Sequence, residues 1–298
     1  MIAEAAGPRH ALMNTITPRI FVAATRQNDG KTTTALGLFA ALKKRFGRIG
    51  YIKPVAQRYI EIDGKNIDED SLLMDRTFGV HIPLEDMSPI AIEPDFTRRY
   101  IDKSNNEFLV RRLRNSFDRA SWEREFTIIE GSGHAGVGAV FDLSNARVAN
   151  LLQSKVVLVT RGGIGSSIDE VALNKALFDR EGVELVGVIM NKVMPEKYDQ
   201  IRDFAQRGLK RLGINLLGVI PREPLLSDAS LGQICDEVRG NFMNAQHHER
   251  RRVRRIIIGA MSSSHVMEYF TPGTLVITPG DREDVILAAL STSALPDA

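Results

Sequence analysis

The sequence predicts an α/β protein with a doubly wound, mostly parallel β-sheet and a small C-terminal α/β module. The first observation is a set of apolar runs that are continuous rather than alternating, as expected for strands covered on both faces. The second is that stretches with helical spacing separate several of these runs. The third is a glycine-containing loop between the first run and a helical stretch. The runs lie at residues 20–23, 50–55, 126–130, 156–160, 185–191 and 216–221.

The loop after the first run has the residues of a phosphate-binding loop. Residues 24–34 read ATRQNDGKTTT, and a helical stretch follows. Gly30 would let the backbone approach a phosphate, and successive amides with the helix N-terminus would supply donors. Lys31 would contact the β- and γ-phosphates, and Thr32 would hold Mg²⁺. The candidate nucleotide contacts here are Thr25, Asn28, Asp29, Gly30, Lys31, Thr32 and Thr33.

The match to the usual pattern G-x-x-x-x-G-K-[ST] is incomplete, because Thr25 stands where the first glycine is expected. The alternative is an ordinary strand-to-helix turn that carries Gly-Lys-Thr by chance. The strand before the loop and the helix after it favour the phosphate loop.

Polar residues end the other apolar runs. In a doubly wound sheet the ligand lies beyond the carboxyl ends of the strands, so we expect these residues to gather at one edge. They are Lys53, Glu130, Thr160 and Asn191. An amide at the position of Asn191 can contact the adenine ring, and Pro221 can flank the base.

Two carboxylates are candidate Mg²⁺ ligands together with Thr32. Asp70 begins a helical stretch and Glu130 ends an apolar run, where a carboxylate would be costly to bury without a partner. Asp68 competes with Asp70, which taken alone is more often a solvated helix-start residue. His134, in the glycine-rich stretch 131–138, is a candidate general base, although a loop histidine is usually only a polar contact.

The composition is that of an ordinary globular protein. The chain has 298 residues, 43% of them hydrophobic, and a formal net charge of +2. A single cysteine, Cys235, excludes an internal disulfide, and no apolar stretch is long enough to span a membrane. Residues 1–18 lack the apolar core of a signal peptide. We therefore expect a cytoplasmic protein with no membrane partner.

The chain divides into four expected parts. A tail at residues 1–18 precedes a nucleotide-binding domain at 19–240, a basic linker at 241–255 and a module at 256–298. Within the domain, residues 60–122 are expected to form helices over the nucleotide edge, including one at 107–125. The module reads strand, helix, strand, helix, and its two short strands need a partner surface, which predicts a homo-oligomer. The basic run at 250–255 favours a solvated linker or subunit contact over a nucleic-acid patch.

As a set, these residues resemble the dethiobiotin synthetase-like P-loop family, and especially the domain of that type at the N-terminus of long bacterial phosphotransacetylases. The phosphate loop and the Lys53-Pro54 pair carry the resemblance. It implies ATP and Mg²⁺ as cofactors, catalytic roles for Lys31 and Lys53, metal positions at Asp70 and Glu130, and adenine recognition by Asn191. Residues 256–290 look like the start of a DRTGG domain.

The sequence departs from dethiobiotin synthetases in ways that put biotin synthesis in doubt. Gln57-Arg58 stands where a small substrate-gripping element is usual, and residues 130–134 read EGSGH rather than EGAGG. Nothing resembles the acetyl-transferring domain of the phosphotransacetylases.

Several functions fit these residues. The leading one is a Mg-ATP-binding protein that acts as a slow ATPase, as an ATP-dependent ligase of a small carboxylate, or as a regulatory domain. A non-enzymatic nucleotide sensor is a second reading. A cobyrinic acid diamide synthetase-like ligase is a third, although Cys235 lacks the context of a nucleophile. A partition-type ATPase is a fourth, although Arg26 stands where such proteins place a signature lysine.

Overall fold

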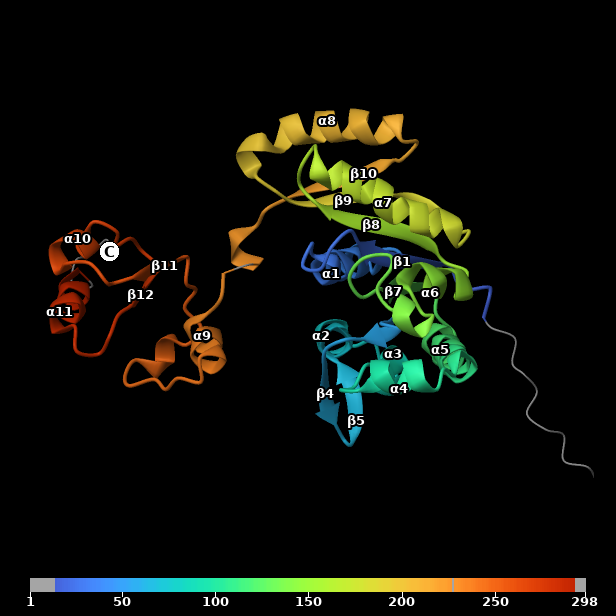
Figure 1. Cartoon of the computed structure of the whole chain (residues 1–298), viewed down its shortest axis with the longest axis horizontal. Helices are drawn as coiled ribbons and strands as arrows, with labels where there is room; N and C mark the ends of the chain where they lie inside the picture. Colours follow the sequence, from blue (N-terminus) through green and yellow to red (C-terminus); the bar gives the residue numbers. More distant parts are fainter. Residues whose placement is uncertain (1–13, 227, 293–298) are drawn as a thin grey trace, which may run out of the picture. The chain divides into compact units, whose positions relative to one another are not determined.

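The computed structural model describes residues 14–226 and 228–292. It divides into two compact units, unit 1 at residues 1–222 and unit 2 at residues 223–298 (Figure 1).

Unit 1 is built on a six-stranded sheet in which every pairing is parallel. The strand order is β10-β9-β8-β1-β7-β2. The bounds are β1 Arg19–Ala24, β2 Ile49–Ile52, β7 Phe126–Glu130, β8 Lys155–Arg161, β9 Leu185–Val193 and β10 Leu216–Pro221. The predicted doubly wound sheet is therefore confirmed, and its strands are the predicted apolar runs.

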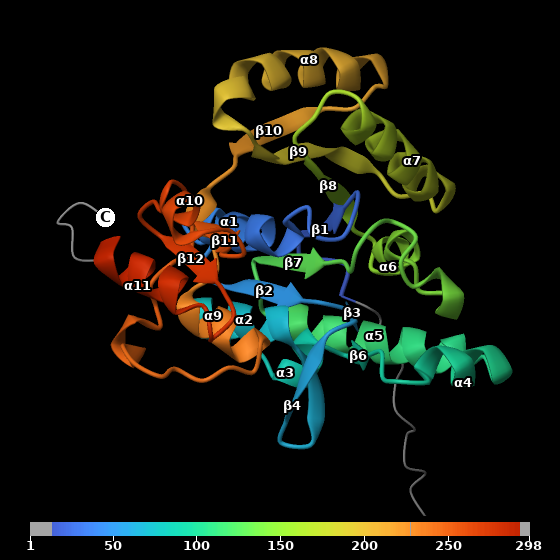
Figure 2. The same cartoon turned by 60° about the vertical axis from the view of Figure 1, so that its left-hand side comes forward.

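Helices cover both faces of this sheet. Helix α1 packs on β1 and β7 and lies on one side, whereas α6 and α7 lie on the other (Figure 2). Helix α8 packs on β10, and α5 packs on β2 and β7. The bounds are α1 Lys31–Leu42, α5 Asn106–Ser121, α6 Asn145–Leu151, α7 Ser166–Arg180 and α8 Tyr198–Arg211, with 3₁₀ turns at Ala139–Phe141 and Pro195–Lys197. Two covered faces explain the continuous apolar runs, because side chains on both faces of the central strands are buried.

The segment between β2 and β7 differs from its prediction. It contains helices, but also an antiparallel hairpin and a short parallel pair. The bounds are β3 Val55–Ala56, β4 Tyr59–Ile62, β5 Lys65–Asp68, α2 Glu69–Phe78, α3 Leu84–Met87, β6 Ile90–Ala91 and α4 Phe96–Asp102. Residues Asp63 and Gly64 form the hairpin turn with positive φ angles, and this Asp-Gly pair is a hairpin signal that the sequence analysis missed. The helix expected at 107–125 ends earlier, at Ser121.

The strand order places a switch point beside β1. The chain leaves β1 for β2 on one side and later passes from β7 to β8 across it. The segments that follow β1, β7, β8 and β9 therefore meet at the carboxyl edge of the sheet, where doubly wound proteins bind their ligands.

Unit 2 contains a two-stranded parallel sheet and three helices among its described residues. The bounds are 3₁₀ turns Pro224–Leu226 and Gln246–His248, α9 Leu231–Glu237, β11 Arg255–Ile258, α10 Ser263–Met267, β12 Thr274–Ile277 and α11 Glu283–Thr292. The predicted order of strand, helix, strand and helix over residues 256–290 is observed.

The boundary between the units falls before α9 rather than near Gly240. Backbone hydrogen bonds tie Leu231 to Arg251 and Gly232 to Glu249, and Ser230 forms a bridge with Arg252. Because of these contacts, residues 223–240 and the basic run belong to unit 2.

No helix in residues 14–226 or 228–292 is long and apolar enough to cross a bilayer.

Candidate functional site

The loop between β1 and α1 is braced by its own buried side chains. The Thr25 hydroxyl lies 2.8 Å from the carboxylate of Asp29, which also accepts a hydrogen bond from the Arg26 amide at 2.9 Å. Thr25 Oγ1 lies 3.0 Å from Thr160 Oγ1 at the end of β8. Thr25, Asp29 and Thr160 are all buried, so their side chains shape the loop from behind.

The end of β9 holds the same loop from another side. Asn191 Nδ2 donates to the Asp29 carbonyl at 2.9 Å, and Lys192 Nζ donates to the Asn28 carbonyl at 2.7 Å. Gly30 has a φ of 95°, and a Cβ there would lie 2.1 Å from Asn191 Nδ2. Glycine is required at this position by both the backbone conformation and the lack of space.

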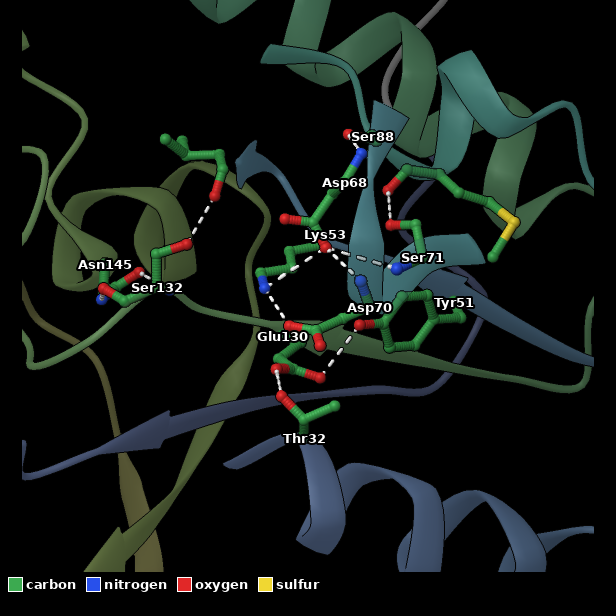
Figure 3. Close-up of polar contacts among 12 residues, drawn as sticks. Thr32, Tyr51, Lys53, Asp68, Asp70, Ser71, Ser88, Glu130, Ser132 and Asn145 are labelled. Atoms are coloured by element: carbon green, nitrogen blue, oxygen red, sulfur yellow. Dashed lines mark hydrogen bonds and ion pairs between the residues drawn. The ribbon is translucent and has the colours of Figure 1, made fainter. Parts of the chain in front are cut away.

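Thr32 and Glu130 meet between α1 and β7. Thr32 Oγ1 donates to Glu130 Oε1 at 2.8 Å, and the Tyr51 hydroxyl donates to Glu130 Oε2 at 2.9 Å (Figure 3). Glu130 is fully buried at the end of β7. Both of its carboxylate oxygens therefore have a partner, as the cost of burying a charge requires.

Lys53, after β2, lies between two carboxylates at the start of α2. Its Nζ pairs with Asp70 and lies 3.3 Å from Asp68 Oδ1 (Figure 3). Asp68 caps α2 by accepting hydrogen bonds from the amides of Asp70 at 2.8 Å and Ser71 at 3.3 Å. Asp68 is thus fixed by the helix, whereas the Asp70 side chain is partly exposed and pairs with Lys53.

Burial and charge shift the pKa values of these groups in different directions. Burial lowers the pKa of Lys31, although Glu130 opposes this. Burial also acts to lower the pKa of Lys53, but Glu130, Asp68 and Asp70 outweigh it and the pKa of Lys53 is raised. Burial raises the pKa of Glu130 against the influence of Lys53. The two lysines and the three carboxylates therefore form one electrostatic cluster.

A cavity of about 420 Å³ opens beside the loop. Its walls carry cationic, anionic and amide groups: Gln27, Asn28, Gly30, Lys31, Thr32, Thr33, Lys53, Gln57, Arg58, Asp68, Glu69, Asp70, Ser132, Gly133 and Lys192. Eight of the candidate residues named from the sequence line it, namely Asn28, Gly30, Lys31, Thr32, Thr33, Lys53, Asp68 and Asp70.

Other candidate residues lie behind the cavity wall or away from it. Thr25, Asp29, Glu130 and Asn191 are buried and do not line it. Pro221 is exposed at the end of β10 and does not line it either. His134, the candidate base, accepts a hydrogen bond from the Gly136 amide at 3.1 Å and is also outside it.

Tyr51 is the contact that the sequence analysis missed. It stands in a strand of otherwise apolar residues and is completely buried. A tyrosine hydroxyl in that position needs a partner, which is the signal that could have linked it to a carboxylate on the neighbouring strand.

The oxygen-rich donor set fits a hard divalent cation. Thr32, Glu130 and Asp70 offer a hydroxyl and carboxylates, which are ligands that Mg²⁺ prefers. Within the described part of the chain, no three His, Cys, Asp or Glu side chains form a metal cage by themselves.

The strand-loop-helix unit at the switch point of a parallel sheet defines a P-loop protein of the nucleotide-binding class. The chain belongs to the AAA domain family AAA_26, whose model matches residues 18–230, and a DRTGG domain matches residues 233–295. Both parts of the resemblance drawn from the sequence are thereby confirmed.

Two curated proteins and one solved structure are among those to which the chain is similar. The chain is 30% identical to a phosphate acetyltransferase of Pseudomonas aeruginosa over 286 residues, which are 90% of this chain but only 39% of that protein. It is 23% identical to an ATP-dependent dethiobiotin synthetase BioD of Methanococcus vannielii, over 67% of this chain and 92% of that protein. A putative plasmid partition protein of Borrelia burgdorferi bound to AMPPNP aligns with 77% of this chain and 93% of its own, at 12% identity and a TM-score of 0.45.

Proposed function

We propose that the chain binds ATP together with Mg²⁺ in the cavity beside the loop that joins β1 to α1. The observation that carries the proposal is the placement of Lys31 and Thr32 in the first turn of α1, directly after the left-handed Gly30. There the helix N-terminus and the loop amides offer donors to an anion, and Lys31 adds a full charge. The dethiobiotin synthetase relative is named as ATP-dependent, which favours ATP among the nucleotides.

Electrostatics in the cavity favour a polyphosphate. Lys53 lies close enough to Lys31 to help lower its pKa, and Lys192 and Arg58 add positive charge to the cavity wall. The Lys31 pKa is lowered by burial, and a phosphate would compensate that burial by supplying an opposite charge. Loss of Lys31 should therefore remove a large part of the binding free energy.

We propose that Thr32, Glu130 and Asp70 hold Mg²⁺ when the nucleotide is present. The ion would neutralise part of the phosphate charge at this site. Glu130 is already oriented toward Thr32 by hydrogen bonds from Thr32 and Tyr51, whereas Asp70 must exchange its ion pair with Lys53 for the metal. Asp70 can make this exchange because its side chain is partly exposed.

The cavity lining also offers groups for a second small anion. Lys53, Gln57 and Arg58 line the cavity together with Ser132 and Gly133 from the loop after β7. We propose a small carboxylate as the second ligand, which would make the chain an ATP-dependent ligase. With water as the acceptor instead, the same site would act as a slow ATPase.

A nucleotide sensor is the second candidate. The carboxylates nearest the phosphate loop are already paired, Asp68 and Asp70 with Lys53 and Glu130 with Thr32 and Tyr51. With these three carboxylates engaged, the site would retain ATP rather than hydrolyse it quickly.

Calorimetric titration with ATP and Mg²⁺ tests the proposal. Lys31→Ala should abolish measurable binding while leaving the fold intact, because the core rests on apolar strands. Lys44→Ala is the matched control, because Lys44 is an exposed lysine just beyond the same helix. Unchanged affinity in Lys31→Ala would rule out the phosphate loop, and measuring released phosphate in the wild type separates an ATPase from a sensor.

A further inference from the structure

The carbonyl groups of the phosphate loop are held from the end of β9 rather than only from within the loop. The two donors are Asn191 Nδ2 at 2.9 Å from the Asp29 carbonyl and Lys192 Nζ at 2.7 Å from the Asn28 carbonyl. These two carbonyls precede the amides of Gly30 and Asp29. In a planar trans peptide the C=O and the following N–H point in opposite directions, so fixing the carbonyl fixes the amide.

The Asn191 amide group is held in one orientation. Its Oδ1 accepts a hydrogen bond from the Lys192 amide at 2.9 Å, which leaves Nδ2 directed at the Asp29 carbonyl. The side chain is buried and does not line the cavity. Its contact with the loop is therefore direct, whereas any contact with a phosphate is blocked by the loop itself.

The local backbone explains how two successive residues reach the same loop. Side chains of neighbouring residues in a regular strand point to opposite faces. Lys192 has a φ of 57°, a left-handed conformation that is uncommon for lysine and interrupts this alternation. Gly162, at the end of β8, donates its amide to the Asn191 carbonyl at 2.8 Å and so fixes Asn191 in the sheet.

We propose that Asn191 and Lys192 are positioning residues for phosphate binding, which act by turning the carbonyls of Asp29 and Asn28 away from the cavity so that the loop amides face it. This inference rests on the proposed function, because it concerns the same phosphate site. It gives Asn191 a role on the phosphate side of the nucleotide, in addition to the base recognition expected from the sequence.

Inorganic tripolyphosphate with Mg²⁺ separates the two roles, because it has phosphates but no base. Asn191→Leu should weaken tripolyphosphate binding by roughly tenfold and ATP binding by a similar factor, since a buried carbonyl loses its partner and the loop loses its shape. Asn150→Leu is the matched control: Asn150 also donates to a backbone carbonyl, that of Glu181 at 3.0 Å, but away from the cavity. It should bind tripolyphosphate as the wild type does.

The outcomes distinguish this inference from the proposed function. If Asn191→Leu lowers the affinity for ATP but binds tripolyphosphate like the wild type, Asn191 contacts the base and the positioning role is wrong. If the wild type binds no tripolyphosphate, the phosphate site itself is wrong. Asn191→Ala, which leaves space instead of adding bulk, serves the same test should the leucine variant fail to fold, and thermal unfolding verifies the fold of each variant.

Discussion

At the scale of single residues, the site is organised by hydrogen bonds and ion pairs between its own side chains. Glu130 binds Thr32 and Tyr51, and Lys53 bridges Asp68 and Asp70. Both carboxylate oxygens of Glu130 and the ammonium group of Lys53 are thus bound by neighbouring side chains, as burial requires. The most polar part of unit 1 can therefore lie at the carboxyl ends of its most apolar strands.

Substitution of either proposed carboxylate ligand should affect metal-dependent nucleotide binding, whereas substitution of an acid outside the cavity should not. Asp70→Asn and Glu130→Gln should each weaken binding of Mg-ATP more than binding of metal-free ATP, because a carboxamide is a poorer ligand for Mg²⁺. Calorimetry with and without EDTA measures both affinities. Asp75→Asn, farther along α2, is the control, and equal losses with and without metal would indicate a structural role.

Tyr51 gives a prediction about stability. Tyr51→Phe leaves Glu130 Oε2 without its hydrogen-bond donor in a fully buried position, which should lower the free energy of unfolding by about 1–3 kcal/mol. Urea unfolding measures the change. A variant as stable as the wild type would show that this hydrogen bond is dispensable.

At the scale of secondary structure elements, sequence patterns predicted the strands and helices whose formation depends on local hydrophobic spacing. The six strands of the central sheet followed from continuous apolar runs, and α1 followed from its spacing after Gly30. The hairpin of β4 and β5 was missed because its strands are only four residues long, and the Asp63-Gly64 turn that marks it was overlooked. The pairing of Lys53 with Asp68 and Asp70 depends on how α2 packs, which no local pattern contains.

An ion pair near the start of α11 Glu283–Thr292 allows a test by pH. Hydrogen bonds from Arg282 at 2.8 and 2.9 Å lower the pKa of Asp284 to about 2. Because the pKa in the folded state lies below the ordinary value of about 3.9, the pair stabilises unit 2 above that pH and loses its effect as the pH falls toward 2. Arg282→Gln should return the pKa of Asp284 to near its ordinary value in a carboxyl NMR titration. A pKa that stays low would assign the shift to another group.

At the scale of the whole molecule, the two units differ in how completely they bury their apolar surface. Unit 1 covers both faces of its parallel sheet, whereas in unit 2 three isoleucines of β11 and β12 are more than half exposed. They are Ile256, Ile258 and Ile277. Parallel sheets are ordinarily covered on both faces, so we propose that unit 2 takes part in homo-oligomer formation.

Removing unit 2 tests this proposal. A chain that ends after Arg222 keeps every strand of the central sheet and every residue proposed to contact the nucleotide. It should bind Mg-ATP like the full chain but have a lower oligomeric state in light scattering. A truncated chain that keeps the parental oligomeric state would contradict the proposed role of unit 2 in oligomer formation. A truncated chain that is folded but does not bind ATP would contradict the assignment of nucleotide binding to unit 1 alone.

A crystal structure of the full chain with Mg²⁺ and AMPPNP would show directly whether the cavity beside the β1–α1 loop holds Mg-ATP. We expect phosphate oxygens in hydrogen-bond contact with Lys31 and the loop amides, and a metal ion between Thr32, Glu130 and the phosphates. We also expect Asp70 to leave Lys53 for that metal. A nucleotide bound elsewhere, or phosphates that contact neither Lys31 nor the loop amides, would contradict the proposed site.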